Sequence, residues 1–367
     1  MEIQHNIQLK SLNTMATPAM ARWFTVAQTE DDILQALEFC KQNNCDYLVL
    51  GEGSNCVFID DLDILVIANR IGGAGHIPNL FKSDAVEIVE ETDKFIDLVI
   101  GAGVNWHQLV KESLDNNFFG LEQLALIPGL VGAAPIQNIG AYGAELKDVL
   151  LSVRAINTLS GEIDELSNQQ CEFGYRDSFF KRQTGKYIIS SVSLRLAKQS
   201  THYQLDDAYP ALRTSLQSLS TNKVITAHDI FHAVCEVRRS KLPDPKRIPN
   251  TGSFFKNPIV SEEKNHQLLS SFPTIIHYPH TDCPKTVKLA AGWLIETIGL
   301  KGFSGRGGVG CYEKQALVII NPKKSKGSDV LYFAEYIQNA VADKFDLKLE
   351  IEPRLYRSKQ GRLLCLS

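Results

Sequence analysis

The chain of 367 residues lacks several features that would assign it to a class of protein at once. Its formal net charge is only -4, with 38 Lys and Arg against 42 Asp and Glu, so it offers no basic field for nucleic acid. No run of apolar residues is long enough to span a bilayer, and the first ten residues do not resemble a secretory signal. We therefore expect a globular cytoplasmic protein with no nucleic-acid partner and no membrane insertion.

The cysteines are too scattered to indicate a metal site or a disulfide framework. All eight stand singly, no CxxC pair occurs, and none clusters with the nine histidines. His277 and His280 are separated by a tyrosine and a proline, which is not a fixed helical pair, and no third ligand follows nearby. We therefore expect reduced thiols and no metal ion.

The length predicts two or three domains, because ordinary domains hold about 100–200 residues. The glycine-rich turn Gly72–Gly75 and the prolines at 243 and 245, which forbid a helix from continuing, indicate two boundaries. We expect three parts, which are 1–72 joined by the C-terminal strand 346–367, then 73–240, and then 241–345.

Hydrophobic periodicity predicts a mixture of helices and strands with irregular connections, which is typical of an α+β fold. Capping boxes formed by Thr29 with Asp32 and by Thr226 with Asp229 mark two helix starts. The expected helices are 29–40, 106–114, 226–241, 287–298 and 329–344. The expected strands are 47–50, 56–59, 64–68, 85–89, 98–100, 149–157, 187–196, 315–321 and 347–356.

Three glycine-rich stretches are candidate ligand loops, namely 51–55, 101–106 and 127–143. Glycines let a backbone turn tightly and present bare amides to a phosphate, although each loop alone is more often a plain turn. The string 305–310 satisfies GxGxxG, but it follows a helix and leads into a strand, which is the reverse of the dinucleotide-binding context. No P-loop motif occurs. Three such stretches together favour a large, flat, polar cofactor.

Seven strings resemble those of the UDP-N-acetylenolpyruvoylglucosamine reductases, in the same order and over nearly the whole chain. They are Leu50–Asn55, Gly101–His107, Pro135–Gly143, Phe173–Ser178, Lys241–Lys246, Gly252–Pro258 and Lys288–Ile295. The segment that carries Tyr278 resembles the insertion of the type I form.

The resemblance implies a two-part FAD-binding fold of the vanillyl-alcohol-oxidase type, followed by an α+β substrate-binding domain. It implies FAD and NADPH as cofactors, UDP-N-acetylglucosamine enolpyruvate as substrate, and we expect a monomer. The residues that it assigns to the cofactor are Gly51, Glu52, Gly53, Ser54, Asn55, Gly101, Gly103, Asn105, Trp106, Pro128, Gly129, Gln137, Asn138, Gly140, Ala141, Tyr142 and Arg354.

The implied reaction is the reduction of an enol ether by hydride from NADPH, passed on through FAD. The enolate that remains needs a cation and then a proton. Arg176 matches the family's cation, and its guanidinium can fork onto a carboxylate. Ser253 matches the proton donor, although without the resemblance Thr-Gly-Ser would be read as a turn.

Glu352 matches the third catalytic position, where it would polarise the double bond and assist protonation. Anchoring the family pattern on Leu349 and Arg354 selects Glu352 and leaves Glu350 as the alternative. Both glutamates would face one side of a strand, because residues two apart do so.

For the substrate, the resemblance implies Tyr175, Tyr209, Lys241, Lys256, Asn257, Tyr278 and Gln315. Tyr209 is followed by proline where the family usually has glycine. Two other functions stay open at this point, which are a flavin oxidase or dehydrogenase of the same fold and a catalytically idle nucleotide-sugar binding protein. The first needs no proton donor, and the second needs none of the three catalytic residues, all of which are present.

Overall fold

The computed structural model describes residues 1–73, 75–200, 205, 209–219, 224–280 and 283–366. The chain divides into two compact units, and each is described by itself. Unit 1 comprises Met1–Gln4, Trp23–Glu52 and Leu65–Arg239, and unit 2 comprises His5–Arg22, Gly53–Ile64 and Ser240–Ser367.

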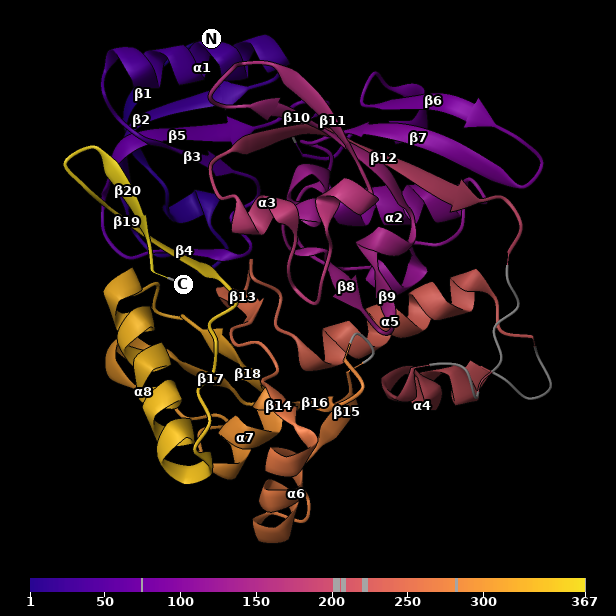
Figure 1. The fold of residues 1–367 in the computed structure, drawn as a ribbon, viewed down its shortest axis with the longest axis vertical. Helices are drawn as coiled ribbons and strands as arrows, with labels where there is room; N and C mark the ends of the chain where they lie inside the picture. Colours follow the sequence, from indigo (N-terminus) through magenta and orange to yellow (C-terminus); the bar gives the residue numbers. More distant parts are fainter. Residues whose placement is uncertain (74, 201–204, 206–208, 220–223, 281–282, 367) are drawn as a thin grey trace. The chain divides into compact units, whose positions relative to one another are not determined.

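The largest sheet of unit 1 has five antiparallel strands in the order β11-β10-β12-β7-β6. Their bounds are β6 Val86–Glu91, β7 Phe95–Gly101, β10 Leu150–Asn157, β11 Ile163–Ser167 and β12 Tyr187–Ala197. The helices α2 (Trp106–Asp115) and α5 (Ala227–Lys241) lie on the same side of this sheet in Figure 1. One apolar core joins them, because buried side chains of both helices pack with those of β10 and β12.

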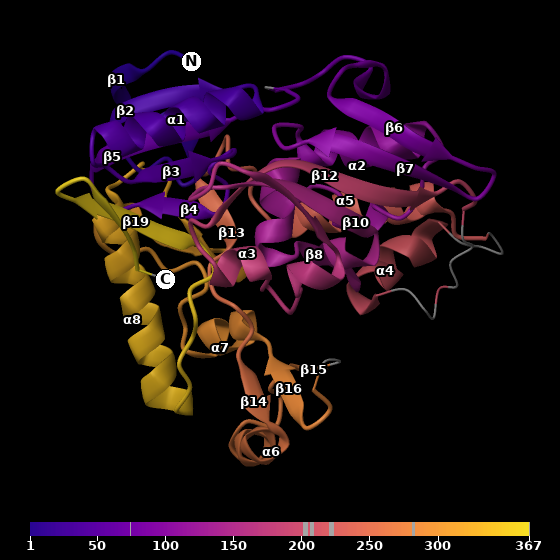
Figure 2. The same cartoon turned by 45° about the horizontal axis from the view of Figure 1, so that its top comes forward.

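A second sheet has the strand order β1-β2-β5-β3. Its strands are β1 Gln4–Gln8, β2 Met20–Ala27, β3 Tyr47–Leu50 and β5 Leu62–Asn69. Helix α1 (Glu30–Gln42) buries Ile33, Ala36 and Cys40 against Leu65 and Ile67 of this sheet (Figure 2). The predicted capping box at its start is present, since Thr29 and Asp32 bond to each other's backbone amides.

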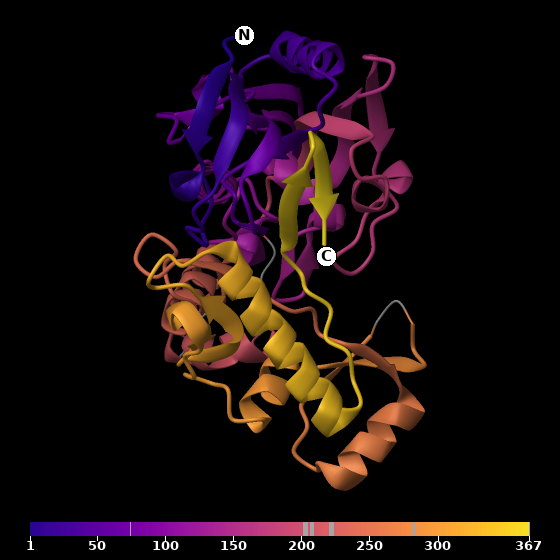
Figure 3. The same cartoon turned by 90° about the vertical axis from the view of Figure 1, so that its left-hand side faces the viewer.

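Unit 2 contains three small sheets, with strand orders β13-β18-β17, β14-β16-β15 and β20-β19-β4. Their strands are β4 Cys56–Phe58, β13 Asn250–Ser253, β14 Ile259–Ser261, β15 His277–Pro279, β16 Thr286–Leu289, β17 Gly310–Tyr312, β18 Gln315–Ile320, β19 Arg354–Lys359 and β20 Arg362–Cys365. The helices are α6 Glu262–Ser271, α7 Ala291–Thr297 and α8 Gly327–Phe345. The long helix α8, yellow in Figure 3, buries one face in the same core as α7 and β18.

The remaining elements are short. They are α3 Phe179–Arg182, α4 Pro210–Leu219, β8 Gly140–Ala141, β9 Ala144–Glu145 and several single 3-10 turns. Within the described ranges, no helix combines the length and apolar character that crossing a membrane requires.

The structure confirms the α+β class and four of the five predicted helices, and it corrects two segments. Residues 287–298 are not one helix, because Thr286–Leu289 form β16, which pairs with both β14 and β15 before α7 begins. The predicted strand 347–356 was too long at its start, since β19 begins only at Arg354. Pro353 has no amide hydrogen to donate to a ladder, which accounts for the late start.

Candidate active site

The three glycine-rich stretches meet in unit 1 around the carboxylate of Glu52. Asn105 donates its side-chain amide to one oxygen of Glu52 at 2.6 Å, and the backbone amide of Gly129 donates to the other at 2.9 Å. The amide of Trp106 in turn donates to the Gly129 carbonyl at 3.0 Å. A single carboxylate therefore holds loop 51–52 against the two other loops.

Close backbone contacts explain why Gly103 is glycine. Its amide donates to the Ile71 carbonyl at 2.6 Å, and an added Cβ would lie only 2.4 Å from the carbonyl oxygen of Gly73. Gly51 differs, because an added Cβ there would meet only the Leu130 side chain, at 3.7 Å. Packing of the protein therefore requires glycine at 103, whereas a Cβ at position 51 would make only ordinary van der Waals contact.

Arg70, which the sequence analysis did not single out, stabilises the first of these loops. Its guanidinium donates to the carbonyls of Leu50 at 3.3 Å and Gly51 at 3.2 Å. Burial lowers the pKa of Arg70, and the nearby Glu52 opposes this shift. In the sequence, Arg70 could have been singled out as the cation that stands between an apolar strand and the glycine turn at 72–75.

Three of the predicted cofactor residues use their side chains inside the protein. Asn138 is fully buried, donating to Glu145 at 2.9 Å and accepting from the Lys147 amide at 3.0 Å. Trp106 is buried in the core, with its indole N–H bonded to the carbonyl of Leu124. Asn105 caps α2 and bonds to Glu52. The side chains of these three residues therefore hold the loops in place.

The other predicted cofactor residues belong to both units. Unit 1 holds Gly51, Glu52, Gly101, Gly103, Pro128, Gly129, Gln137, Gly140, Ala141 and Tyr142, and unit 2 holds Gly53, Ser54, Asn55 and Arg354. Within unit 2, the Gly53 carbonyl accepts from the Thr14 amide at 3.0 Å, and the Arg354 amide donates to the Asn55 carbonyl at 3.0 Å.

Arg176 lies in unit 1 beside the third loop, in a constrained backbone conformation. Its guanidinium donates to the Gly140 carbonyl at 2.9 Å and lies 5.8 Å from the centre of the Tyr175 ring. Arg176 has φ 53°, and Tyr142 in the loop has φ 51°, both in the left-handed region that residues with side chains rarely adopt. Such strained positions cluster at functional sites.

Tyr142 contacts two further residues, Tyr209 and Arg238. Its ring meets that of Tyr209 edge to face, with centroids 5.8 Å apart, and 38% of Tyr209 is exposed. Burial raises the pKa of Tyr142, and the guanidinium of Arg238 on α5 opposes this shift. Arg238 was not among the predicted site residues, although it stands three residues before Lys241 in a predicted helix.

The backbone segments that carry Ser253 and Glu352 run side by side in unit 2. Ser253 ends β13 and pairs with Val318 of β18. The next residue, Phe254, accepts a hydrogen bond from the Glu352 amide at 3.0 Å, and Phe255 forms an isolated bridge with Ile351. The backbone around residue 352 thus runs beside the end of β13, so the structure brings these two predicted residues together.

Glu350, the alternative to Glu352, is engaged elsewhere. Its carboxylate forms an ion pair with Lys256, and its carbonyl accepts from the Lys256 amide at 2.9 Å. The Glu350 side chain is 69% exposed. The expected strand facing does not apply to the two glutamates, since no strand covers residues 350–353. The ion pair with Lys256 is what separates Glu350 from Glu352.

Two predicted substrate residues flank the start of α7 in unit 2. Asn257 accepts from the Ala291 amide at 3.0 Å, and the side-chain oxygen of Gln315 lies 2.9 Å from where a Cβ on Gly292 would stand. Tyr278 on β15 is 38% exposed and lies opposite Lys288 of β16, and Lys241 is exposed at the end of α5.

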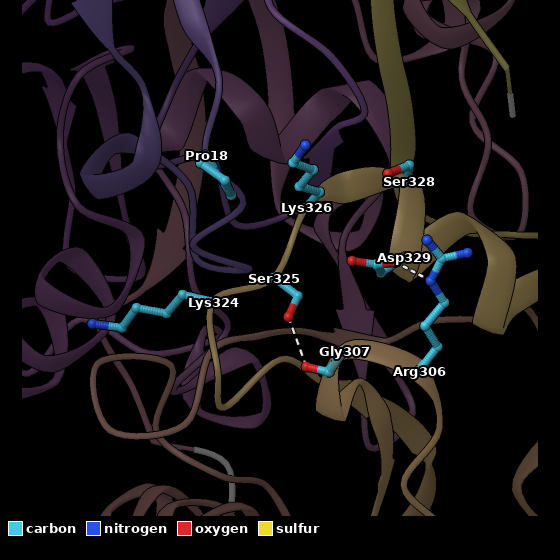
Figure 4. Close-up of a pocket in the computed structure, with 8 residues that line it drawn as sticks. All are labelled: Pro18, Arg306, Gly307, Lys324, Ser325, Lys326, Ser328 and Asp329. Atoms are coloured by element: carbon cyan, nitrogen blue, oxygen red, sulfur yellow. Dashed lines mark hydrogen bonds and ion pairs between the residues drawn. The ribbon is translucent and has the colours of Figure 1, made fainter.

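A separate pocket of about 460 Å³ lies in unit 2, between the GxGxxG string and the start of α8 (Figure 4). Ser325 donates to the Gly307 carbonyl at 2.6 Å, and Arg306 forms an ion pair with Asp329 at 3.1 Å. The string leads into strand β17 and not into a helix, as expected. The part of the chain that the structure describes contains no group of three metal-binding side chains.

Comparison with known proteins gives matches along nearly the whole chain. Residues 21–167 match a family described as an FAD binding domain, and residues 244–356 match one described as the UDP-N-acetylenolpyruvoylglucosamine reductase C-terminal domain. The UDP-N-acetylenolpyruvoylglucosamine reductase of Escherichia coli (strain K12) is 42% identical over 350 residues, which cover 95% of this chain and 95% of that protein. The Yersinia pestis protein of the same name is 43% identical over 347 residues, which cover 94% of both chains.

The fold is similar to that of a solved reductase. The crystal structure of UDP-N-acetylenolpyruvylglucosamine reductase from Thermus caldophilus matches with a TM-score of 0.64 and 23% identity, over 97% of this chain and 99% of that chain. At this level of identity the likeness concerns the fold, and it agrees with the predicted FAD-binding domain plus substrate domain.

Proposed function

Because the chain belongs to the family of UDP-N-acetylenolpyruvoylglucosamine reductases, FAD-binding enzymes of peptidoglycan precursor synthesis, we propose that it takes hydride from NADPH and uses it to reduce a sugar nucleotide. The catalytic residues in this proposal are Arg176, Ser253 and Glu352. The enolpyruvyl ether of UDP-N-acetylglucosamine becomes UDP-N-acetylmuramate. The observation that supports this best is the 3.0 Å hydrogen bond from Glu352 to Phe254, which holds Glu352 beside Ser253.

The loops of unit 1 fit FAD in their chemistry. Gly51 carries no side chain, an added Cβ there would meet only the Leu130 side chain, and Glu52 and Arg70 fix the loop that carries Gly51. Bound FAD supplies the hydride that reaches the terminal carbon of the enolpyruvyl double bond. We assign the cofactor to the loops 51–55, 101–106 and 127–143.

Arg176 stabilises the negative charge that hydride addition leaves on the substrate. The hydride forms a new C–H bond, and the electron pair of the double bond moves toward the neighbouring carboxylate as an enolate. A guanidinium stays charged and can donate two parallel hydrogen bonds to that carboxylate. Its bond to the Gly140 carbonyl fixes its direction.

Ser253 then donates its hydroxyl proton to the remaining carbon, which completes the lactyl ether. A serine hydroxyl is a weak acid, but an enolate carbon is a strong base, and the transfer proceeds where the geometry is fixed and water is excluded. Glu352 orients the double bond and assists this protonation. Over the whole cycle, NADPH is oxidised to NADP⁺ and the enolpyruvyl group is reduced.

For the substrate we propose Tyr175, Tyr209, Lys241, Lys256, Asn257, Tyr278 and Gln315. We further propose the type I form, on the segment that carries Tyr278, a division into the three predicted domains, and a monomer. A cytoplasmic location follows from the substrates, since UDP-sugars and NADPH are cytoplasmic metabolites. Membership of the family favours the reductase over the flavin oxidase and over the idle binding protein.

The test separates the two half-reactions of the S253A variant in the absence of oxygen. We expect NADPH to bleach its flavin at the wild-type rate. Subsequent addition of UDP-N-acetylglucosamine enolpyruvate should restore the oxidised flavin roughly 10²–10⁴ times more slowly, which is the usual contribution of a positioned proton donor. Stopped-flow absorbance of the flavin measures both rates.

S270A serves as the control, because Ser270 is exposed on α6 of the same unit and its hydroxyl bonds only to the His266 carbonyl in its own helix. It should behave as the wild type. Reoxidation of S253A at the wild-type rate would remove Ser253 from the mechanism. A wild-type protein that NADPH bleaches but the enolpyruvyl sugar nucleotide does not reoxidise would contradict the proposed cycle.

A further inference from the structure

Arg238 is a half-buried cation whose Nε is buried without a partner among the described residues. No carboxylate among the described residues forms an ion pair with it, whereas Arg154, Arg182 and Arg195 of the same unit all have one. A guanidinium has five N–H donors, and leaving them buried without acceptors or a counter-charge costs free energy.

The neighbours of Arg238 increase this imbalance. Burial lowers its pKa, and the guanidinium of Arg176 lowers it further, while the Tyr142 hydroxyl and the Cys235 thiol act in the opposite direction. Burial also lowers the pKa of His107, and Arg239, Arg238 and Lys111 add to that shift. The charges that act on this part of unit 1 are therefore cationic, and a bound anion would relieve their repulsion.

The end of a helix does not explain Arg238. Cations are favoured in the last turn of a helix because the carbonyl ends carry a partial negative charge. Arg239 stands in the same turn of α5 and is exposed, as a cation of this kind normally is. The Arg238 side chain is half-buried and instead hydrogen-bonds to the side chain of Tyr142, a residue of the third glycine-rich loop.

We propose that Arg238 is the second guanidinium of an anion subsite that it forms with Arg176, and that this subsite takes the enolpyruvyl carboxylate of the substrate. The inference rests on the proposed function. Two guanidiniums can occupy both oxygens of one carboxylate and stabilise the extra charge that develops as it becomes an enolate. The diphosphate of the nucleotide is the other anion that such a pair could bind, and the experiment distinguishes the two.

The experiment measures the binding of two sugar nucleotides to the FAD-loaded enzyme through the change in flavin absorbance. UDP-N-acetylmuramate carries the carboxylate and the diphosphate, whereas UDP-N-acetylglucosamine carries only the diphosphate. We expect R238Q to weaken the first by roughly tenfold to a hundredfold, the range for a lost hydrogen bond to a charged group, and to leave the second within about twofold. R239Q, the matched control on the exposed neighbour, should change neither.

R238K provides the second variant, because it keeps the charge and removes the fork. It should recover part of the lost affinity for UDP-N-acetylmuramate. If R238Q does not fold, R238K still tests the proposal, because its affinities for the two sugar nucleotides can be compared with those of the wild type. Equal weakening of both ligands would assign Arg238 to the diphosphate and overturn the proposal, as would wild-type affinity for both. Failure of the proposed function is seen separately, as a wild-type enzyme that does not turn over the enolpyruvyl substrate.

Discussion

Several polar residues that look like ligand contacts in the sequence are structural supports in the fold. Glu52 uses both carboxylate oxygens on Asn105 and Gly129, and the side-chain amide of Asn138 donates to Glu145 and accepts from the Lys147 amide. Buried polar groups are stable only when they are satisfied in this way. Arg238 differs, because its buried Nε has no partner among the described residues.

His107 makes a prediction about pH. Burial lowers its pKa below the ordinary value of 6.5, and its Nδ1 accepts a hydrogen bond from the Leu126 amide at 3.1 Å. Near pH 6.5 the unfolded chain therefore binds a proton at His107, whereas the folded protein does not. The contribution of His107 to the free energy of unfolding is fully present above that pH and is lost as the pH falls below it.

The variant H107N keeps an acceptor for Leu126 but cannot titrate. Between about pH 7.5 and pH 5.5, we expect the free energy of unfolding to fall less steeply for H107N than for the wild type. The difference between the two slopes should be at most the value for one bound proton. Urea unfolding at a series of pH values measures this. Parallel curves for the two proteins would show that His107 is protonated in the folded state as readily as in the unfolded one.

At the scale of elements, the glycine-rich loops serve two purposes that a pair of variants can separate. In G103A the new Cβ would collide with backbone of residues 70–73, and we expect a loss of about 1–3 kcal/mol in stability, as in other overpacked sites. In G51A the new methyl group has room, and the melting temperature of the FAD-free protein should stay close to that of the wild type.

G51A should nevertheless bind FAD at least about tenfold more weakly, because its methyl group would cover backbone that we assign to the cofactor. Thermal melting of the FAD-free protein and titration with FAD measure the two effects. Unchanged FAD affinity in G51A would mean that this loop is a turn and nothing more.

At the scale of the whole molecule, each unit has its own apolar core, one around β12 and one around α8. Matches to an FAD-binding domain fall on residues 21–167, most of which belong to unit 1. A cofactor that binds only the folded chain stabilises it by mass action, by about 2.7 kcal/mol at a hundredfold excess over its dissociation constant.

Removal of FAD should therefore lower the melting temperature, and added FAD should restore it in proportion to the logarithm of its concentration. Differential scanning calorimetry of the FAD-free protein with increasing FAD tests this. A melting temperature that does not depend on FAD would mean that the folded chain binds it no better than the unfolded one.

The sequence by itself determined the elements whose signals are local. Capping boxes placed the starts of α1 and α5, because the cap and the residue three positions later bond within one turn. It also determined the family, since seven strings in order depend on no structure. It did not predict β16 correctly, because Thr286–Leu289 become a strand only through pairing with residues some 27 and ten positions away.

Only the tertiary structure decided which polar groups of the candidate site are already bonded within the protein. The two oxygens of Glu52 find partners 53 and 77 residues later in the chain, and the Glu352 amide bonds to the carbonyl of Phe254, which stands 98 residues earlier, next to Ser253. Arg238 looked like an ordinary helix residue until its burial beside Tyr142 was known. Burial and charge balance are sums over neighbours that are distant in sequence, so no local pattern contains them.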